Sequence, residues 1–352
     1  MSDKKKSYRK SQLIAFENVA AGHDGVLSDP SGEIVVKPCK QSEISFYQSV
    51  PAHPDFLPLI PIFMGRLSFG SDTSIAQAAE TLILPGETTP DPPAGSGIAG
   101  AAVIENEWAP SNGAKIQTDM AIVLENVAHG YRKPNILDVK LGARLWADDA
   151  PAAKRVKLDK VAEETTSKPL GFRIAGMRTY QGMDMVGKGD VRSDGYRLYD
   201  KMYGRGFTVN TVSEGFREYF GLVEGTKAEG PIRKVIKRFI GNLREVEEVM
   251  EKEESRMYSA SLLFVYEGDT RALQDAFPTE KEILASLENN SPTDEGTDDN
   301  EDNELTPPKF PSIQSLKLID FAHAQWTPGQ GPDTNLLHGI RHVIRILSEI
   351  AG

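Results

Sequence analysis

The sequence lacks several features that define large classes of protein. Its 352 residues include one cysteine, Cys39, which excludes an internal disulfide framework and fits a reducing compartment. No apolar stretch of secretory length follows the basic N-terminus, and no window approaches the roughly 20 apolar residues of a membrane span. The glycine-rich G-x-G-x-x-G pattern, the P-loop and an H-R-D-type catalytic loop are also missing. We therefore expect a soluble intracellular protein that is neither an ordinary protein kinase nor a P-loop NTPase.

Positive charge is also in deficit, but unevenly. The chain has 40 Lys+Arg against 51 Asp+Glu, a formal charge of −11. Seven of the acids lie in residues 289–304, NNSPTDEGTDDNEDNE, which contain no base; without them the charge is −4. The remainder can therefore carry a local basic site for an anionic ligand, whereas the total charge argues against direct, sequence-specific nucleic-acid binding.

The order of apolar runs, periodic segments and loop-like insertions along the chain predicts two lobes of mixed helix and strand. Residues 84–114 and 268–311 are predicted to be mobile insertions, the second of them a disordered acidic loop. Apolar periodicity at three- and four-residue steps predicts a long helix over 232–250 and a closing helix over 336–347. Two lobes joined by a short connection would leave a cleft, which is a common ligand site. Short β-branched runs predict strands at 33–36, 120–127, 135–141, 261–266 and 315–321.

The segment PNILDVKLG, residues 134–142, is the most informative for chemistry. On a strand, alternate residues share a face, so Asp138 and Lys140 point the same way. A carboxylate beside an ammonium suits phosphoryl transfer, because one can orient a hydroxyl while the other neutralises phosphate charge. Taken alone, the pattern also fits an exposed ion pair.

In context, P-x-x-x-D-x-K-x-G is a signature of the inositol polyphosphate kinase family, which this sequence resembles from about residue 20 to its C-terminus. The resemblance implies an α+β, two-lobed inositol polyphosphate kinase fold with a protein-kinase-like ATP cleft and a short helical insertion that binds inositol phosphate. It divides the chain into a basic flexible tail (1–19), an N-terminal lobe (20–127) and a C-terminal lobe (128–352). Within the family, GARLWADDAP and KLDKVAEETTS are most similar to the fungal multikinases. Further motifs occur in the family's order: AGHDGV (21–26), VVK (35–37), LENV (124–127), LGFRIAGMRTY (170–180), YGR (203–205), SLLFVYEG (261–268) and IDFAH (319–323).

For the nucleotide, the resemblance implies ATP and Mg²⁺, with Asp138, Lys140 and Asp320 as the catalytic residues. Lys37 would reach the ATP phosphates, and Asp138 would meet the ribose hydroxyls. The backbone of Glu125 and Val127 would bind the adenine edge, so the identity of those side chains should matter little. Two further residues form the metal region. Asp320 would bind Mg²⁺, because a carboxylate oxygen is a preferred ligand of that ion, and Ser261 would line the same site, with a buried serine bonded to backbone as the alternative.

For the inositol phosphate, the resemblance implies contacts from Lys140 and His323, with no general base assigned. Several phosphates need a dense cationic surface, which a helix at about 151–168 would supply. Arg144, Arg178 and Lys201 are secondary candidates, for which a salt-bridged surface role is an equal alternative. The basic substrate ligands would be Lys154, Arg155, Lys157, Lys160 and Lys201.

Several alternatives stay open at this point. The substrates expected are soluble inositol polyphosphates such as the 1,4,5-trisphosphate and tetrakisphosphate on the way to pentakisphosphate, with a phosphoinositide lipid as a further candidate. The rivals are an inositol hexakisphosphate kinase and a transcription-factor scaffold that retains the kinase fold and binds protein partners through its acidic loop. PAAKRVKLD, residues 151–159, also resembles the nuclear import signal of the Myc protein, so the location expected is nuclear, cytoplasmic or both.

Overall fold

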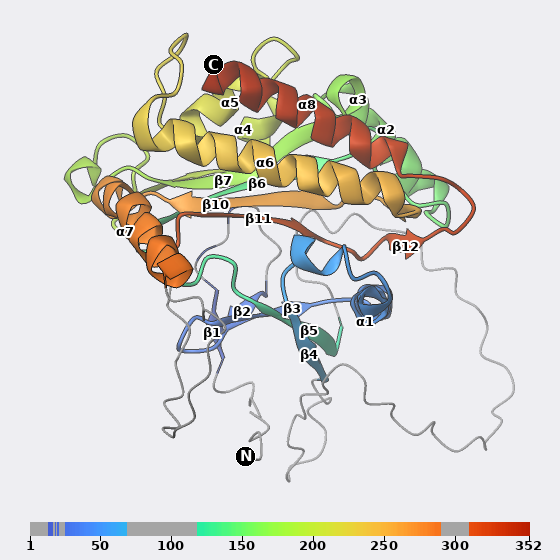
Figure 1. The fold of residues 1–352 in the computed structure, drawn as a ribbon. Helices are drawn as coiled ribbons and strands as arrows, with labels where there is room; N and C mark the ends of the chain where they lie inside the picture. Colours follow the sequence, from blue (N-terminus) through green and yellow to red (C-terminus); the bar gives the residue numbers. More distant parts are fainter. Residues whose placement is uncertain (1–12, 17, 19, 21–24, 69–117, 290–309) are drawn as a thin grey trace, which may run out of the picture.

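The computed structural model describes residues 13–16, 18, 20, 25–68, 118–289 and 310–352 (Figure 1). The predicted insertion at 84–114, most of the acidic tract and most of the basic tail lie outside these residues. Two antiparallel sheets form the body of the protein, one in each lobe. The prediction of a mixed, two-lobed architecture agrees with this arrangement.

The N-terminal sheet has the strand order β1-β2-β3-β5-β4. A small apolar cluster from β3, β4 and β5 covers one face, including Val36, Leu67 and Val123. The predicted lobe boundary at residue 20 is wrong, because β1 already pairs with β2 in this sheet. The elements of this lobe are β1 (Ile14–Ala15), β2 (Leu27–Ser28), β3 (Ile34–Pro38), α1 (Gln41–Ser49), the short 3₁₀ turns η2 (Val50–Ala52) and η3 (Leu57–Leu59), β4 (Phe63–Ser68) and β5 (Met120–Glu125).

The C-terminal sheet has the order β11-β10-β6-β7-β8, and a separate two-stranded ribbon pairs β9 with β12. Its central strands are almost entirely buried, which explains why their sequences read as apolar runs with few polar residues. The strands are β6 (Pro134–Leu141), β7 (Phe172–Tyr180), β8 (Tyr196–Tyr199), β9 (Ser255–Met257), β10 (Ser261–Glu267), β11 (Gln314–Ile319) and β12 (Ala324–Trp326).

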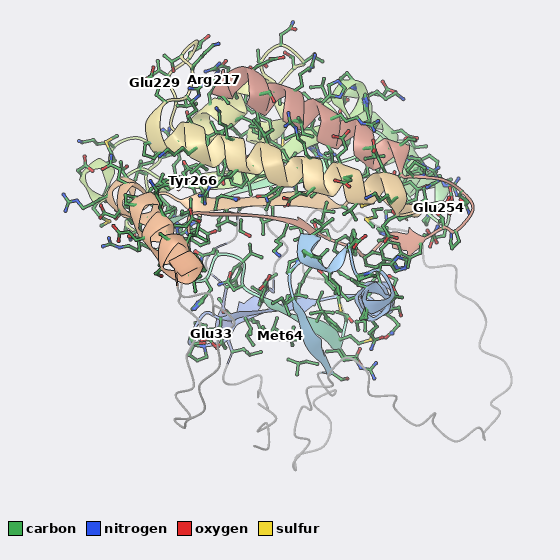
Figure 2. All side chains as sticks on the ribbon, in the orientation of Figure 1. Glu33, Met64, Arg217, Glu229, Glu254 and Tyr266 are labelled. Atoms are coloured by element: carbon green, nitrogen blue, oxygen red, sulfur yellow. The ribbon has the colours of Figure 1, made fainter. Side chains whose placement is uncertain are left out.

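Two long helices, α6 and α8, cover the face of this sheet that is turned away from the N-terminal lobe (Figure 1). The apolar positions of α6 recur at helical spacing and are buried, from Val235 to Met250. Side chains fill the space between the helices and the sheet (Figure 2), where Tyr266 donates a hydrogen bond to the Tyr219 carbonyl at 2.9 Å. No helix in the described part of the chain has the length and apolar content needed to cross a bilayer. The helical elements of this lobe are α2 (Ala152–Glu163), α3 (Ser167–Leu170), η4 (Met183–Met185), α4 (Lys201–Arg205), α5 (Val212–Tyr219), α6 (Gly230–Lys252), α7 (Thr270–Asn289) and α8 (Thr334–Ala351).

The helix α7 corrects the predicted loop over 268–311. Residues 270–289 are helical, and Leu273 and Ala276 on this helix are buried. Glu280 forms a two-pronged ion pair with Arg238 of α6, one contact of which measures 3.0 Å. Burial of its apolar side chains therefore makes this segment helical, although the acidic tract that follows it had suggested a loop.

Helix α1 is the main contact between the lobes. The Phe46 ring stacks on Phe321 at 4.8 Å and on Trp326 at 5.0 Å between ring centroids. Ser42, in the first turn of α1, donates to the Ala322 carbonyl at 2.8 Å. These contacts fix α1 against the segment that follows β11, so residues on both elements are held in a defined relation.

Candidate active site

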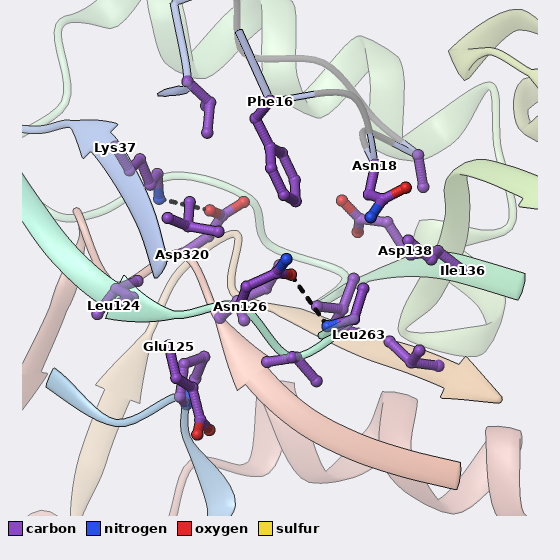
Figure 3. Close-up of a pocket in the computed structure, with 18 of the residues that line it drawn as sticks. Phe16, Asn18, Lys37, Leu124, Glu125, Asn126, Ile136, Asp138, Leu263 and Asp320 are labelled. Atoms are coloured by element: carbon purple, nitrogen blue, oxygen red, sulfur yellow. Dashed lines mark hydrogen bonds and ion pairs between the residues drawn. The ribbon is translucent and has the colours of Figure 1, made fainter. Parts of the chain in front are cut away.

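A pocket opens between the two lobes (Figure 3). Its walls are largely apolar, with Val35 and Leu124 on the N-terminal side and Leu263 on the C-terminal side. Lys37 and Asp320 line its polar end. A narrow apolar slot that ends in charged groups suits a flat aromatic base with an anionic tail.

Lys37 is held by two carboxylates. Its Nζ lies 2.7 Å from Asp320 Oδ1 and 2.8 Å from Glu43 Oε1. Burial alone would lower the pKa of this ammonium, but the two carboxylates outweigh burial and hold the pKa well above its ordinary value. Lys37 is therefore charged at neutral pH and aimed into the pocket, as its predicted contact with ATP phosphates requires.

Glu43 is a site residue that the sequence reasoning missed. It lies in the first turn of α1 and is only 2% exposed. A carboxylate inside an apolar helical face is costly to bury without a partner. That position, next to Ile44 and close to Phe46, is the signal that could have identified it.

Asp320 follows β11 and connects Lys37 to the predicted catalytic strand. Its Oδ2 lies 3.4 Å from Lys140 Nζ, which also donates to the Ser259 carbonyl at 2.8 Å. Asp320 and Ser259 both have positive φ angles, 69° and 59°. This conformation is unfavourable for residues other than glycine and persists only where the surroundings enforce it, often at functional sites.

Asp138 reaches the same opening from β6. It is 6% exposed and lines the pocket together with Asp320, while Lys140 contacts Asp320 directly. Strand β6 has a register shift between Asp138 and Val139 where it pairs with β7. The fold thus brings the three predicted catalytic side chains to one place, although Asp138 and Asp320 are far apart in the sequence.

The residues present fit a divalent metal. Ser261 lies opposite Ile319 in the β10–β11 ladder and opposite Lys140 in the β10–β6 ladder, directly beside Asp320. Its buried Oγ has no hydrogen-bond partner within the described residues, so the alternative of a serine bonded to backbone does not hold. No group of three or more His, Cys, Asp or Glu residues in the described ranges could hold a metal by itself. Mg²⁺ commonly takes only one or two carboxylates and completes its coordination with phosphates and water, which matches such a sparse site.

The connection between the lobes presents backbone to the pocket. The Glu125 side chain turns away and lies 3.8 Å from Lys317 Nζ (Figure 3). The Asn126 N–H donates to the Glu33 carbonyl at 2.8 Å, whereas the Val127 N–H has no hydrogen-bond partner among the residues described. The geometry therefore agrees with a main-chain contact to the adenine edge in which the Glu125 side chain takes no part.

A basic cluster lies next to this centre. Lys154 of α2 donates to His323 Nε2 at 3.1 Å. Burial, with the charges of Lys154 and Lys40, lowers the pKa of His323 to about 4, and burial with Lys40 lowers the pKa of Lys154. His323 is thus neutral near pH 7. Lys40, at the start of α1, is a second residue that the sequence reasoning missed, and it adds an N-terminal-lobe charge to the cluster.

Other predicted substrate ligands are engaged elsewhere. The Arg155 guanidinium donates to the Ala150 carbonyl at 2.7 Å and stacks over Trp146. Lys160 forms an exposed pair at 3.7 Å with Glu164, the residue that follows α2. These two are therefore weaker candidates than Lys154.

The remaining basic candidates differ in exposure. Lys157 is half-buried on α2 and Lys201 is exposed at the start of α4. Arg144 stacks over Trp146 and pairs with Asp148, in agreement with the salt-bridged surface role, whereas Arg178 is 6% exposed and its contacts lie within the protein.

The comparisons with known proteins agree with this geometry. A family model described as inositol polyphosphate kinase matches residues 121–348. The chain belongs to the inositol polyphosphate kinase family and is an inositol phosphate kinase enzyme.

Among the relatives, the inositol polyphosphate multikinase of Saccharomyces cerevisiae is 30% identical over 94% of this chain and 96% of its own, and that of Schizosaccharomyces pombe is 28% identical over 95% and 96%. Inositol hexakisphosphate kinase 1 of Homo sapiens is 30% identical but covers 65% of this chain and 52% of its own. A crystal structure of the S. cerevisiae inositol phosphate multikinase Ipk2 with ADP and Mn²⁺ superposes with a TM-score of 0.60 at 26% identity, covering 91% of this chain and all of that one. The predicted fold is thereby confirmed.

Proposed function

We propose that this chain is an ATP- and Mg²⁺-dependent multikinase that phosphorylates inositol 1,4,5-trisphosphate and tetrakisphosphate toward pentakisphosphate. The observation that carries the proposal is the run of charged contacts from Lys37 through Asp320 to Lys140. It lies where the apolar slot for a base meets the basic cluster of Lys154 and His323. The multikinase relatives align along nearly the whole chain, which favours this activity over that of the hexakisphosphate kinases.

In this mechanism the protein positions groups and neutralises charge, and it forms no covalent intermediate. Lys37 holds ATP phosphate oxygens, with Glu43 fixing its ammonium from the opposite side. Asp138 meets the ribose hydroxyls, and Lys140 faces the phosphoryl group in transfer. Asp320, beside Ser261, would hold Mg²⁺, which when bound offsets the charge that develops on the phosphate oxygens.

On the acceptor side, Lys154 supplies positive charge. The neutral imidazole of His323 can donate a hydrogen bond to a phosphate or accept one from an inositol hydroxyl. Lys140, between the two halves of the site, bonds to the Ser259 carbonyl, which restrains its ammonium. Lys157, Lys160, Lys201 and Arg155 are further proposed contacts at the rim.

The test is product analysis with purified protein, ATP and Mg²⁺. We expect trisphosphate to give tetrakis- and pentakisphosphate, and hexakisphosphate to give no pyrophosphate product. Pyrophosphate formation from hexakisphosphate without trisphosphate turnover would instead establish the hexakisphosphate kinase. The Asp320→Ala variant separates the scaffold alternative, because a scaffold keeps its cellular role when turnover is lost.

Three finer proposals concern partners and location: a phosphoinositide lipid as a second substrate, protein partners at the acidic tract 289–304, and nuclear entry through 151–159. Residues 152–163 form α2, whereas import signals are read in extended form, so carrier and substrate would compete for this segment. Imaging a fluorescent fusion with and without Lys157→Ala tests the import role. Exclusion of the variant from the nucleus supports it, and an unchanged distribution contradicts it.

A further inference from the structure

Arg178 of β7 is buried, and its guanidinium bonds to Asn18, in the segment that follows β1. One of its nitrogens, Nη1, donates to Asn18 Oδ1 at 2.6 Å. The other, Nη2, lies 3.2 Å from Asp194 Oδ2, and the group stacks 3.4 Å from the centre of the Tyr196 ring. The contacts with Asp194 and Tyr196 therefore fix the direction from which Arg178 approaches Asn18.

The same segment meets β7 at a second point. Gly176 lies two residues before Arg178 and so shares its face of the strand. A Cβ at Gly176 would lie 2.2 Å from the Ala20 carbonyl oxygen, so only glycine admits the chain this closely. Asn18 and Ala20 are thus seated on one strand face by contacts two residues apart.

These seated residues belong to the wall of the pocket. Phe16, Asn18 and Ala20 all line it, and Figure 3 shows Phe16 and Asn18 projecting toward the space between Lys37 and Asp138. Arg178 itself is not among the lining residues. Any effect of Arg178 on a bound nucleotide must therefore act through Asn18 and its neighbours.

The chemistry of the contact fixes the orientation of the Asn18 amide. A guanidinium only donates hydrogen bonds, so it must face the amide oxygen. The amide nitrogen, with two donor hydrogens, is then turned away from Arg178, and the pocket receives a donor rather than an acceptor.

We propose that Asn18 donates a hydrogen bond to an oxygen of the bound nucleotide and that Arg178 is the positioning residue that orients the Asn18 amide. The inference rests on the proposed function, in which this pocket binds ATP. It reassigns Arg178 from the inositol phosphate to the nucleotide side of the reaction.

The decisive variant is Asn18→Asp. Aspartate keeps an acceptor for Arg178, with charge assistance, but replaces the donor with a carboxylate in a pocket for anions. We expect the dissociation constant for ADP, measured by calorimetry, to rise about tenfold or more, while the melting temperature without nucleotide stays at the wild-type value or above it. Asn18→Ala should weaken ADP binding about fivefold, since one neutral hydrogen bond is lost.

Arg178 is tested by Arg178→Met and Arg178→Lys. Loss of orientation should raise the KM for ATP about fivefold in the methionine variant while the KM for inositol trisphosphate is unchanged. Lysine, which keeps one charged donor, should restore part of the difference. The control is Arg341→Met, which removes an ion-paired guanidinium from the outer helix α8 and should leave both KM values unchanged.

The outcomes test the roles of Asn18 and Arg178 separately from the proposed kinase function. Wild-type affinity for ADP in Asn18→Asp overturns the donor role, and a wild-type KM for ATP in Arg178→Met overturns the positioning role. If Arg178→Met fails to fold, the two Asn18 variants and Arg178→Lys decide. If the wild-type protein binds ADP and the variants weaken that binding, but no inositol phosphate is turned over, the inference stands and the proposed function fails.

Discussion

Replacing Glu43 with glutamine tests whether the site depends on a lysine held from two sides. Glu43 is 2% exposed and lies 2.8 Å from Lys37 Nζ, which also lies 2.7 Å from Asp320. A hydrogen bond to a charged group contributes about 1.5–3 kcal/mol, and glutamine can still accept one hydrogen bond. We therefore expect a cost near the lower value, about 1.5 kcal/mol, which corresponds to roughly a tenfold loss in kcat/KM for ATP.

Two assays and one control accompany this variant. Steady-state kinetics should show the loss in kcat/KM for ATP, and thermal unfolding should show a melting temperature lowered by about 2 °C. The control is Glu247→Gln, which breaks a more exposed pair with Arg341 on the outer helices and should change neither value appreciably. Wild-type kcat/KM in Glu43→Gln would refute the view that Glu43 positions Lys37.

The other predictions concern the remaining parts of the site. Asp320→Asn, whose side chain tolerates a positive φ, should fold normally yet lose at least about 1,000-fold in kcat, as followed by trisphosphate turnover; appreciable residual activity would count against a metal ligand there. Val127→Pro should abolish ADP binding in calorimetry, whereas Glu125→Ala should weaken it less than about threefold, and equal effects would contradict a main-chain contact. The folded-state pKa of His323, about 4, lies below the unfolded value near 6.5, so the unfolded state takes up the proton first and stability falls as the pH drops from 6.5 to 4. Lys154→Met should raise the pKa of His323 and reduce the loss of stability at low pH. If the melting temperatures of both proteins fall equally between pH 7.5 and 4.5, this coupling is contradicted.

The sequence predicted five of the strands, β3, β5, β6, β10 and β11, and the central residues of the site, because both leave local signals. Buried strands read as short apolar runs, and Asp138 and Lys140 interrupt such a run with the spacing of one strand face. The family motifs then placed Lys37 and Asp320 in the same site. Their actual contact, across 283 residues, follows only from the fold.

The missed features depend on contacts that the local sequence does not encode. Glu43 meets Lys37 only six residues away, but across the junction of β3 and α1, whereas Asn18 meets Arg178, 160 residues away. Helix α7 was missed because the acidic tract after it dominated the composition, although Leu273 and Ala276 carry its buried face. Local patterns thus identify elements, whereas pairs that close a site require the three-dimensional arrangement.

The way α1 is seated bears on how such an enzyme is regulated. In protein kinases, activity requires an ion pair between a strand lysine and a helix glutamate, and the position of that helix controls whether the pair forms. Here an outward movement of α1 would strip Phe46 and Phe321 from each other and expose two buried rings to water. We expect the contacts of Lys37 with Glu43 and Asp320 to be formed before any ligand binds. Turnover in the cell should then follow the supply of nucleotide and inositol phosphate rather than a movement of α1 between an active and an inactive position.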